Sequence, residues 1–198
     1  MRNIKSLILV FVFISSIACK ENITKTSVKQ EIPLQGLVSR KILDTVMLTD
    51  DIESWEQGYR FSSSKNGRIT KLGCYMPNNL TYRVALWNCN TEDLIAAIPV
   101  KVTDSTKFNY QDITPIPIEA NKEYLITINN TINNSTKSFF KLGIRSTPYN
   151  EITFPITSGL IKIEAGHMAS TKTLRYPADQ FITYKLYGAP DFVFEPAE

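Results

Sequence analysis

The chain has 198 residues, of which 43% are hydrophobic and 21% are charged. These proportions are those of ordinary globular proteins, and they exclude collagen-like, coiled-coil and largely disordered chains. The 22 basic and 19 acidic residues leave a formal charge of +3, too small for the basic surface of a nucleic-acid-binding protein. Because His167 is the single histidine, a zinc site built from several imidazoles is also excluded.

The N-terminal residues have the pattern of a bacterial signal peptide. Arg2 and Lys5 precede an unbroken apolar run over residues 7–14. This run is far shorter than the roughly 20 residues that a membrane-spanning helix needs. The sequence Ser-Ile-Ala-Cys at residues 16–19 resembles a lipobox, which implies cleavage directly before Cys19 and a diacylglyceryl group on its sulfur. The alternative is an ordinary secretory signal, with the cysteine incidental.

Lipidation at Cys19 predicts an outer-membrane lipoprotein whose partner is the membrane. Cleavage removes two basic residues and leaves 20 basic and 19 acidic ones, so a basic surface does not supply the attachment. Two or more acyl chains anchor a protein stably, whereas one chain does not. Lys20 and Glu21 resemble the charged export signal of surface lipoproteins of the Bacteroidota, which implies a surface-exposed position.

The chain after the signal peptide divides into a tether and one domain. Residues 19–41 are polar and unpatterned, contain Pro33 and Gly36 as breakers, and lack the apolar surface needed for order. Residues 42–198 are numerous enough to form a single proper core. We therefore predict a signal peptide over 1–18, a lipidated cysteine with a flexible tether over 19–41, and a domain over 42–198.

The domain is predicted to consist of β-strands. Alternation of apolar and polar residues recurs along it, whereas no stretch has the apolar period of an amphipathic helix. Strands are predicted over residues 69–76, 82–88, 94–102, 113–118, 123–129, 139–144, 160–163, 181–187 and 191–194. Pro115 and Pro117 restrict one of them to a sheet edge. Many short strands with Asn-, Thr- and Pro-rich turns predict an all-β, antiparallel β-sandwich.

Five short motifs follow one another in the first half of the domain. They occupy residues 55–61 (WEQGYRF), 67–75 (GRITKLGCY), 84–87 (VALW), 94–96 (LIA) and 121–124 (NKEY). In this order they resemble the domain-of-unknown-function 4082 family of bacterial surface and secreted proteins, although Gln57 replaces a leucine and Cys74 a phenylalanine. The resemblance implies a jelly-roll-like sandwich, similar in shape to carbohydrate-binding modules, with no established catalytic residues.

No residue pattern predicts catalysis by a nucleophile. His167 has Ser170 and Asp179 nearby in the sequence, but no Gly-x-Ser-x-Gly motif marks a nucleophile. Sequence proximity alone does not make a triad. We therefore interpret His167 as a loop histidine without a catalytic partner, and the protein as a non-enzyme.

A cluster of carboxylates, Asp50, Asp51 and Glu53, precedes the first clear strand. Its simplest interpretation is a solvated turn. Structural calcium at this edge is one alternative, and a carboxylate pair for glycoside hydrolysis is another. No other cofactor is indicated, because phosphate-binding glycine motifs are missing from the sequence.

Aromatic residues are the one feature that predicts a ligand. Sugars can stack their C–H faces on aromatic rings, and Trp55, Tyr75, Tyr149 and Tyr176 lie outside obvious inward-facing strand positions. We predict that these four converge at one end or face of the sandwich. The predicted function is binding or scaffolding, with a glycan or a surface protein as partner. The alternatives are a structural subunit of a surface complex and a hydrolase.

The remaining cysteines, Cys74 and Cys89, are predicted to stay free. A turn at residues 77–79 is expected to close a hairpin in which Cys74 faces Tyr82. Cys89 then lies roughly 20 Å further along the strand, well beyond the reach of a disulfide. Cys74 is expected to pack in the core instead.

Overall fold

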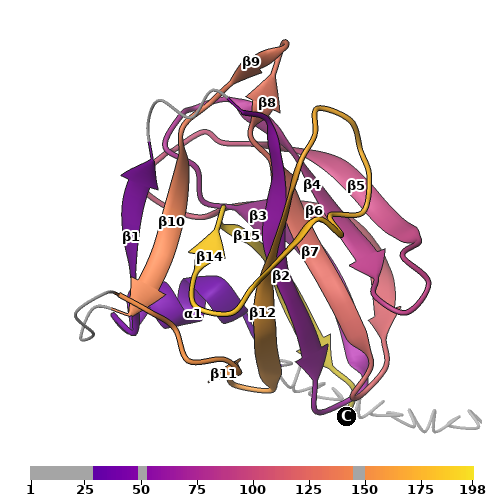
Figure 1. The fold of residues 1–198 in the computed structure, drawn as a ribbon. Helices are drawn as coiled ribbons and strands as arrows, with labels where there is room; N and C mark the ends of the chain where they lie inside the picture. The colour runs from indigo at the N-terminus through magenta and orange to yellow at the C-terminus, as the bar shows by residue number, and fades with distance from the viewer. Residues whose placement is uncertain (1–28, 49–52, 145–149) are drawn as a thin grey trace, which may run out of the picture.

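The computed structural model describes residues 29–48, 53–144 and 150–198 (Figure 1). Cys19 and the predicted signal peptide lie outside these ranges, as do Asp50, Asp51 and Tyr149. Within the described ranges, no helix is long and apolar enough to cross a membrane.

The described residues form short strands and one helix. The helix is α1 (Pro33–Ser39). The strands are β1 (Leu43–Leu48), β2 (Trp55–Ser63), β3 (Gly67–Cys74), β4 (Thr81–Asn88), β5 (Leu94–Lys101), β6 (Asn109–Ile118), β7 (Glu123–Asn129), β8 (Thr131–Ile132), β9 (Ser135–Thr136), β10 (Phe139–Ile144), β11 (Ile156–Ser158), β12 (Ile161–Ser170), β13 (Gln180–Ile182), β14 (Leu186–Tyr187) and β15 (Pro190–Pro196).

Two antiparallel sheets face each other. The larger sheet has the order β11-β12-β2-β7-β4-β5, with β13 also paired to β12, and the smaller has the order β15-β3-β6. Figure 1 shows the larger sheet in front of the smaller one. A third sheet, β1-β10-β14, closes one side, and β8 and β9 form a separate hairpin. The prediction of an all-β, antiparallel β-sandwich is confirmed.

Aromatic rings join the two sheets in the core. Phe61 of β2 lies 4.4 Å from Phe192 of β15 and 5.8 Å from Tyr124 of β7, measured between ring centroids. All three rings are buried. Fully burying a residue of this size stabilises a fold by about 1.5–3 kcal/mol, so these contacts hold the layers together.

The central strand β2 was not among the predicted strands. Its inward-facing positions include the amide side chain of Gln57, and its outward-facing positions include Gly58, so the apolar alternation is interrupted. The glycine is required by the pairing of β2 with β7. A Cβ atom at residue 58 would lie 1.9 Å from the carbonyl oxygen of Ile126, a contact that no side chain can make.

The hairpin predicted at residues 77–79 is wrong. β3 pairs with β6 and β15, whereas β4 pairs with β5 and β7, so residues 75–80 cross from the smaller sheet to the larger one. Cys74 is fully buried in the core, and both Cys74 and Cys89 are free, as predicted. The reason differs from the predicted one, because Cys74 ends β3 of the smaller sheet, whereas Cys89 follows β4 of the larger sheet.

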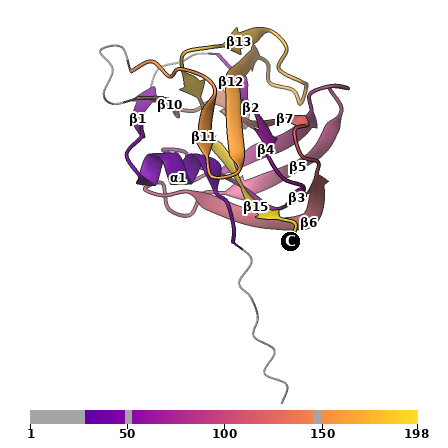
Figure 2. The ribbon, with the colours of Figure 1, turned by 90° about the horizontal axis from the view of Figure 1, so that it is seen from below.

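The predicted flexible tether is too long, because its second half belongs to the domain. Glu31 pairs with Phe194 through two backbone hydrogen bonds of 2.8 and 2.9 Å. α1 follows, begins at Pro33, and buries Leu34 and Leu37 completely. Figure 2 shows α1 beside β1 and β15. The sequence does contain a helix signal, namely a proline in the first turn and two leucines three residues apart. This signal was missed because the segment as a whole is polar.

Candidate binding face

The larger sheet has a second face, which points away from the smaller sheet and is here called the outer face. Polar side chains at alternate positions of β2, β7 and β4 lie on it, together with the separate buried cluster of Ala85, Trp87 and Leu125. Residues 171–184, here called the covering segment, cross in front of β2 and β7 (Figure 1). Part of the outer face is therefore shielded from solvent.

A buried carboxylate organises the centre of the outer face. Glu56 has no exposed surface, and its carboxylate accepts hydrogen bonds from Arg83 Nη2 and Thr127 Oγ1, both at 2.6 Å. Asn129 Nδ2 donates a third, at 3.2 Å. Trp87 Nε1 extends the network by donating to Thr127 Oγ1 at 2.9 Å. A carboxylate with an arginine and two further donors is held in place rather than available as a general acid or base.

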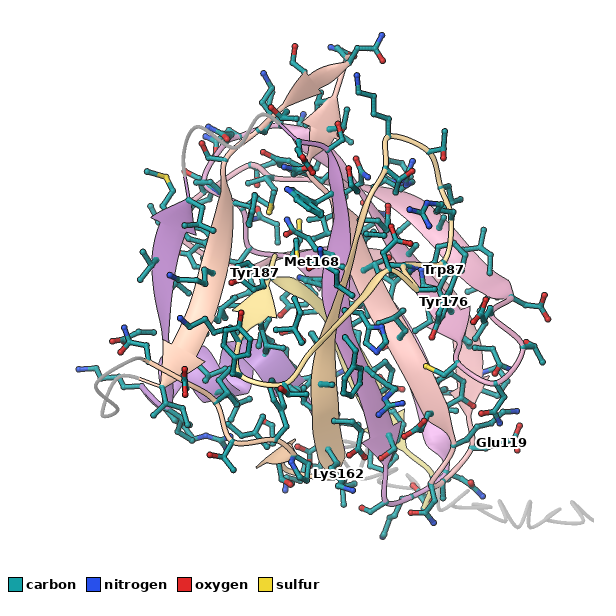
Figure 3. The ribbon with its side chains drawn as sticks, viewed as in Figure 1. Trp87, Glu119, Lys162, Met168, Tyr176 and Tyr187 are labelled. Carbon is teal, nitrogen blue, oxygen red and sulfur yellow. The ribbon has the colours of Figure 1, made fainter. Side chains whose placement is uncertain are left out.

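The covering segment is fixed to this network at two points. Asn129 Nδ2 donates to the carbonyl oxygen of Thr171 at 3.1 Å. The ring of Tyr176 meets the ring of Trp87 edge to face, with 6.0 Å between centroids (Figure 3). Tyr176 is also hydrogen-bonded to Cys89, and burial raises the pKa of the Cys89 thiol to about 11. The segment is therefore part of the fold around Trp87.

Beyond Tyr176, the covering segment presents an exposed ring. Phe181 is 53% exposed, with the Arg60 guanidinium 5.1 Å from its centroid and the His167 ring edge-on at 5.2 Å. His167 Nδ1 lies 3.4 Å from the carbonyl oxygen of Pro177, and burial lowers the pKa of the imidazole. One side of the Phe181 ring is thus supported while the ring remains accessible.

Two grooves lie near opposite ends of β2. The first, of about 410 Å³, is lined by residues 81–83, 97–99 and 131–133 and is called the β4–β5 groove. The second, of about 620 Å³, is called the β6 groove; it is lined by residues 66–68, 117–119 and 195–198 together with Pro115. At the start of β2, the backbone N–H of Trp55 donates a hydrogen bond to Asn130, which lies next to the β4–β5 groove. At the end of β2, the carbonyl oxygen of Ser63 accepts a hydrogen bond from the backbone N–H of Asn121, which lies near the β6 groove.

The structure separates the aromatic residues that were predicted to converge. Tyr75 stacks between Phe108 and Phe140 at centroid distances of 5.2 and 4.3 Å, as part of the main core. Tyr176 packs on the outer face instead. Of the three predicted rings that the structure describes, Tyr176 alone lies on that face.

Trp55, another of the predicted rings, does not lie on the outer face. Trp55 is half-buried at the start of β2 and packs against the main core. Tyr149 lies outside the described residues. The sequence analysis also missed Glu56, Arg83 and Phe181. Glu56 lies on β2, which was not predicted as a strand, whereas Arg83 and Phe181 lie in predicted strands whose neighbours in the sheet were not known.

The residues considered for catalysis are not assembled into a triad. His167 lies within strand β12 and not in a loop, and its Nε2 has no partner among the described residues. Asp179 is paired instead with Arg175, whose Nη1 donates to it at 3.0 Å. Glu53 is exposed. Across the three described ranges, no group of three His, Cys, Asp or Glu side chains is placed to hold a metal ion.

A comparison with known proteins gives one family. The model of a domain of unknown function (DUF4082) matches residues 43–185. The matched range contains the whole larger sheet and the whole covering segment, but neither α1 nor β15. No curated protein matches the chain.

Proposed function

The chain belongs to the family of domain of unknown function 4082, and we propose that it is a membrane-anchored, non-catalytic module that binds a glycan on the outer face. The observation that carries this proposal is the supported but exposed ring of Phe181, which lies on the same covering segment as the half-buried Tyr176. Aromatic rings held this way offer a stacking surface at little entropic cost, because they are already ordered.

The anchor in this proposal is a lipid on Cys19, in a surface-exposed lipoprotein of the outer membrane. The lipobox-like residues 16–19 support it. Replacing Cys19 with Ala is expected to abolish fatty-acid labelling and to release the protein from the membrane fraction. If the variant still incorporates fatty acid and still sediments with membranes, the anchor is not at this cysteine.

Glycan binding is tested with residues 20–198, the mature chain without its lipidated cysteine, on an array of oligosaccharides. Phe181→Ala is expected to weaken binding about tenfold, the equivalent of about 1.4 kcal/mol, without lowering the melting temperature. Met47→Ala is the matched control, because Met47 is 51% exposed but lies on β1, away from the outer face. Equal loss in both variants, or no loss in either, would count against the outer face.

One observation favours the second candidate, a structural subunit that contacts another protein. β1 is an edge strand among the described strands, and it exposes Val46 and Met47. Exposed apolar edges favour pairing with another chain. Under this alternative, Val46→Lys is expected to disrupt a complex recovered by cross-linking while leaving glycan binding unchanged.

A further inference from the structure

The β4–β5 groove lies on the outer face, next to the buried network but clear of Phe181. Arg83, Ala97 and Pro99 occupy outward positions of β4 and β5, as the pairing of Arg83 with Pro99 and of Ala85 with Ala97 shows. Thr131 and Ile132 of β8 complete the wall. A space of about 410 Å³ lies within the range of small-molecule sites in proteins.

The polar part of the groove is rigid. Arg83 is held by Glu56, which is itself fixed by Thr127 and Asn129, so the guanidinium stands in one orientation. Arg83 Nε and Thr131 Oγ1 have no hydrogen-bond partner among the residues that the structure describes. Both atoms are buried, so the polar surface that Arg83 offers to the groove is the rest of its side chain, which is 30% exposed.

The charges around the groove disfavour an anionic ligand. The buried Glu56 carboxylate, 2.6 Å from Arg83, compensates the guanidinium charge. An anionic ligand would gain little net attraction and would approach a second negative charge. Hydroxyl groups can instead pair with guanidinium, threonine and amide groups without carrying charge themselves.

The apolar part of the groove lies directly beside these donors. Pro99, Ala97 and Ile132 present C–H surfaces to the same space. Apolar surface with a few fixed polar groups is the usual composition of a ligand site. A ligand that fits has alternating hydroxyl groups and C–H faces, which is the chemistry of a neutral saccharide.

We propose that the β4–β5 groove is a second saccharide subsite, selective for neutral sugars. The proposal rests on the proposed glycan binding and adds a site that Phe181 does not form. The groove is also well placed: residues 30 and 31 join the domain at Glu195 and Phe194, beside the β6 groove. Figure 1 shows the β8–β9 hairpin at the opposite end from the C-terminus. A chain attached through its N-terminal segment therefore holds the β4–β5 groove at its far end.

The test titrates residues 20–198 with neutral cello-, xylo- and manno-oligosaccharides and with anionic oligogalacturonides, by calorimetry. Thr81→Trp fills the groove from an exposed strand position, and Arg83→Lys keeps a positive charge opposite Glu56 while removing the planar guanidinium group. Each variant is expected to weaken neutral-sugar binding about tenfold or more. Thr114→Trp, the same substitution at an exposed position of β6, is expected to leave binding unchanged.

The outcomes separate the two proposals. If the unaltered chain binds a neutral oligosaccharide, and Phe181→Ala weakens it but Thr81→Trp does not, the groove proposal is overturned and the proposed function stands. Tighter binding of the oligogalacturonides than of the neutral sugars also overturns the groove proposal. If the unaltered chain binds none of the probes, both proposals fail. Circular dichroism melting of each variant separates lost binding from lost fold.

Discussion

Asp191 and Gln35 are joined by a hydrogen bond of 2.8 Å, although 156 residues separate them in the sequence. The Asp191 carboxylate also accepts hydrogen bonds from the Leu34 backbone at 3.1 Å and from the hydroxyls of Tyr59 and Tyr110 at 3.3 and 2.8 Å. It therefore caps α1 from the last strand of the chain. Burial raises the pKa of Asp191 to about 6, although the backbone and tyrosine hydrogen bonds act in the opposite direction.

The raised pKa predicts a fold that loses stability as Asp191 ionises. Between pH 3.8 and about 6, the folded chain holds a proton that the unfolded chain has released, so the free energy of unfolding falls as pH rises. The full loss from this group is at most about 3 kcal/mol. Urea unfolding across this pH range measures it, and Asp191→Asn is expected to remove that part of the slope. Asp112→Asn, on the exposed edge of β6, is expected to keep it.

A second prediction concerns the helix within the expected tether. Leu37→Ala removes a fully buried side chain and is expected to lower the free energy of unfolding by about 2–5 kcal/mol. Val38→Ala, a half-buried neighbour, is expected to cost less. A chain that begins at Ile42 loses α1 entirely and is expected to unfold at lower urea than one that begins at residue 20. Equal unfolding midpoints for these two chains would show that α1 is dispensable.

The strands that the sequence predicted well are those with intact alternation. β3, β4 and β7 each match their predicted ranges within two residues, because their inward positions are apolar, as with Tyr124, Ile126 and Ile128 of β7. The local pattern of residues did not predict which strands belong to the same sheet. The turn residues at 77–79 are the same whether a chain folds back on its own sheet or crosses to another, and only long-range pairing decides between them.

The candidate site was less predictable than the fold. Glu56, Thr127 and Arg83 come from three strands, and they meet only because β2, β7 and β4 are neighbours in the larger sheet. Nothing in the spacing of these residues along the chain indicates that order. Whether an individual side chain is exposed or buried was equally hard to predict from the sequence. Tyr75 stands outside the inward-facing positions of the strand predicted over residues 69–76, yet its ring is held in the core by Phe140.

Gln57 provides a third prediction. Its side chain is fully buried, and neither its oxygen nor its nitrogen has a hydrogen-bond partner in the described part of the chain. An unpaired buried amide costs about 1–3 kcal/mol, and leucine has a similar volume. Gln57→Leu is therefore expected to raise the free energy of unfolding, measured in urea. Gln111→Leu, at an exposed position of β6, is the control and is expected to change stability little.

The two free cysteines provide a fourth prediction. Burial raises the pKa of the Cys74 thiol to about 12 and that of Cys89 to about 11, so little thiolate exists in the folded chain. A thiol reagent at mildly alkaline pH is expected to modify the half-buried Cys89 slowly, and Cys74 only on unfolding. Without reductant, the unfolded residues 20–198 should titrate with two thiols. A missing pair would reveal a disulfide and contradict the structure.

The partners of β2 also determine when the protein can fold. Phe61 pairs in register with Tyr124 of β7 on one side and with Ile163 of β12 on the other, so this early strand needs a late one to complete its hydrogen bonds. α1 likewise needs Asp191, near the end of the chain, for its cap. Such distant pairings make folding slow, on the order of milliseconds to seconds. A chain that emerges N-terminus first must therefore remain unfolded until nearly all of it is available.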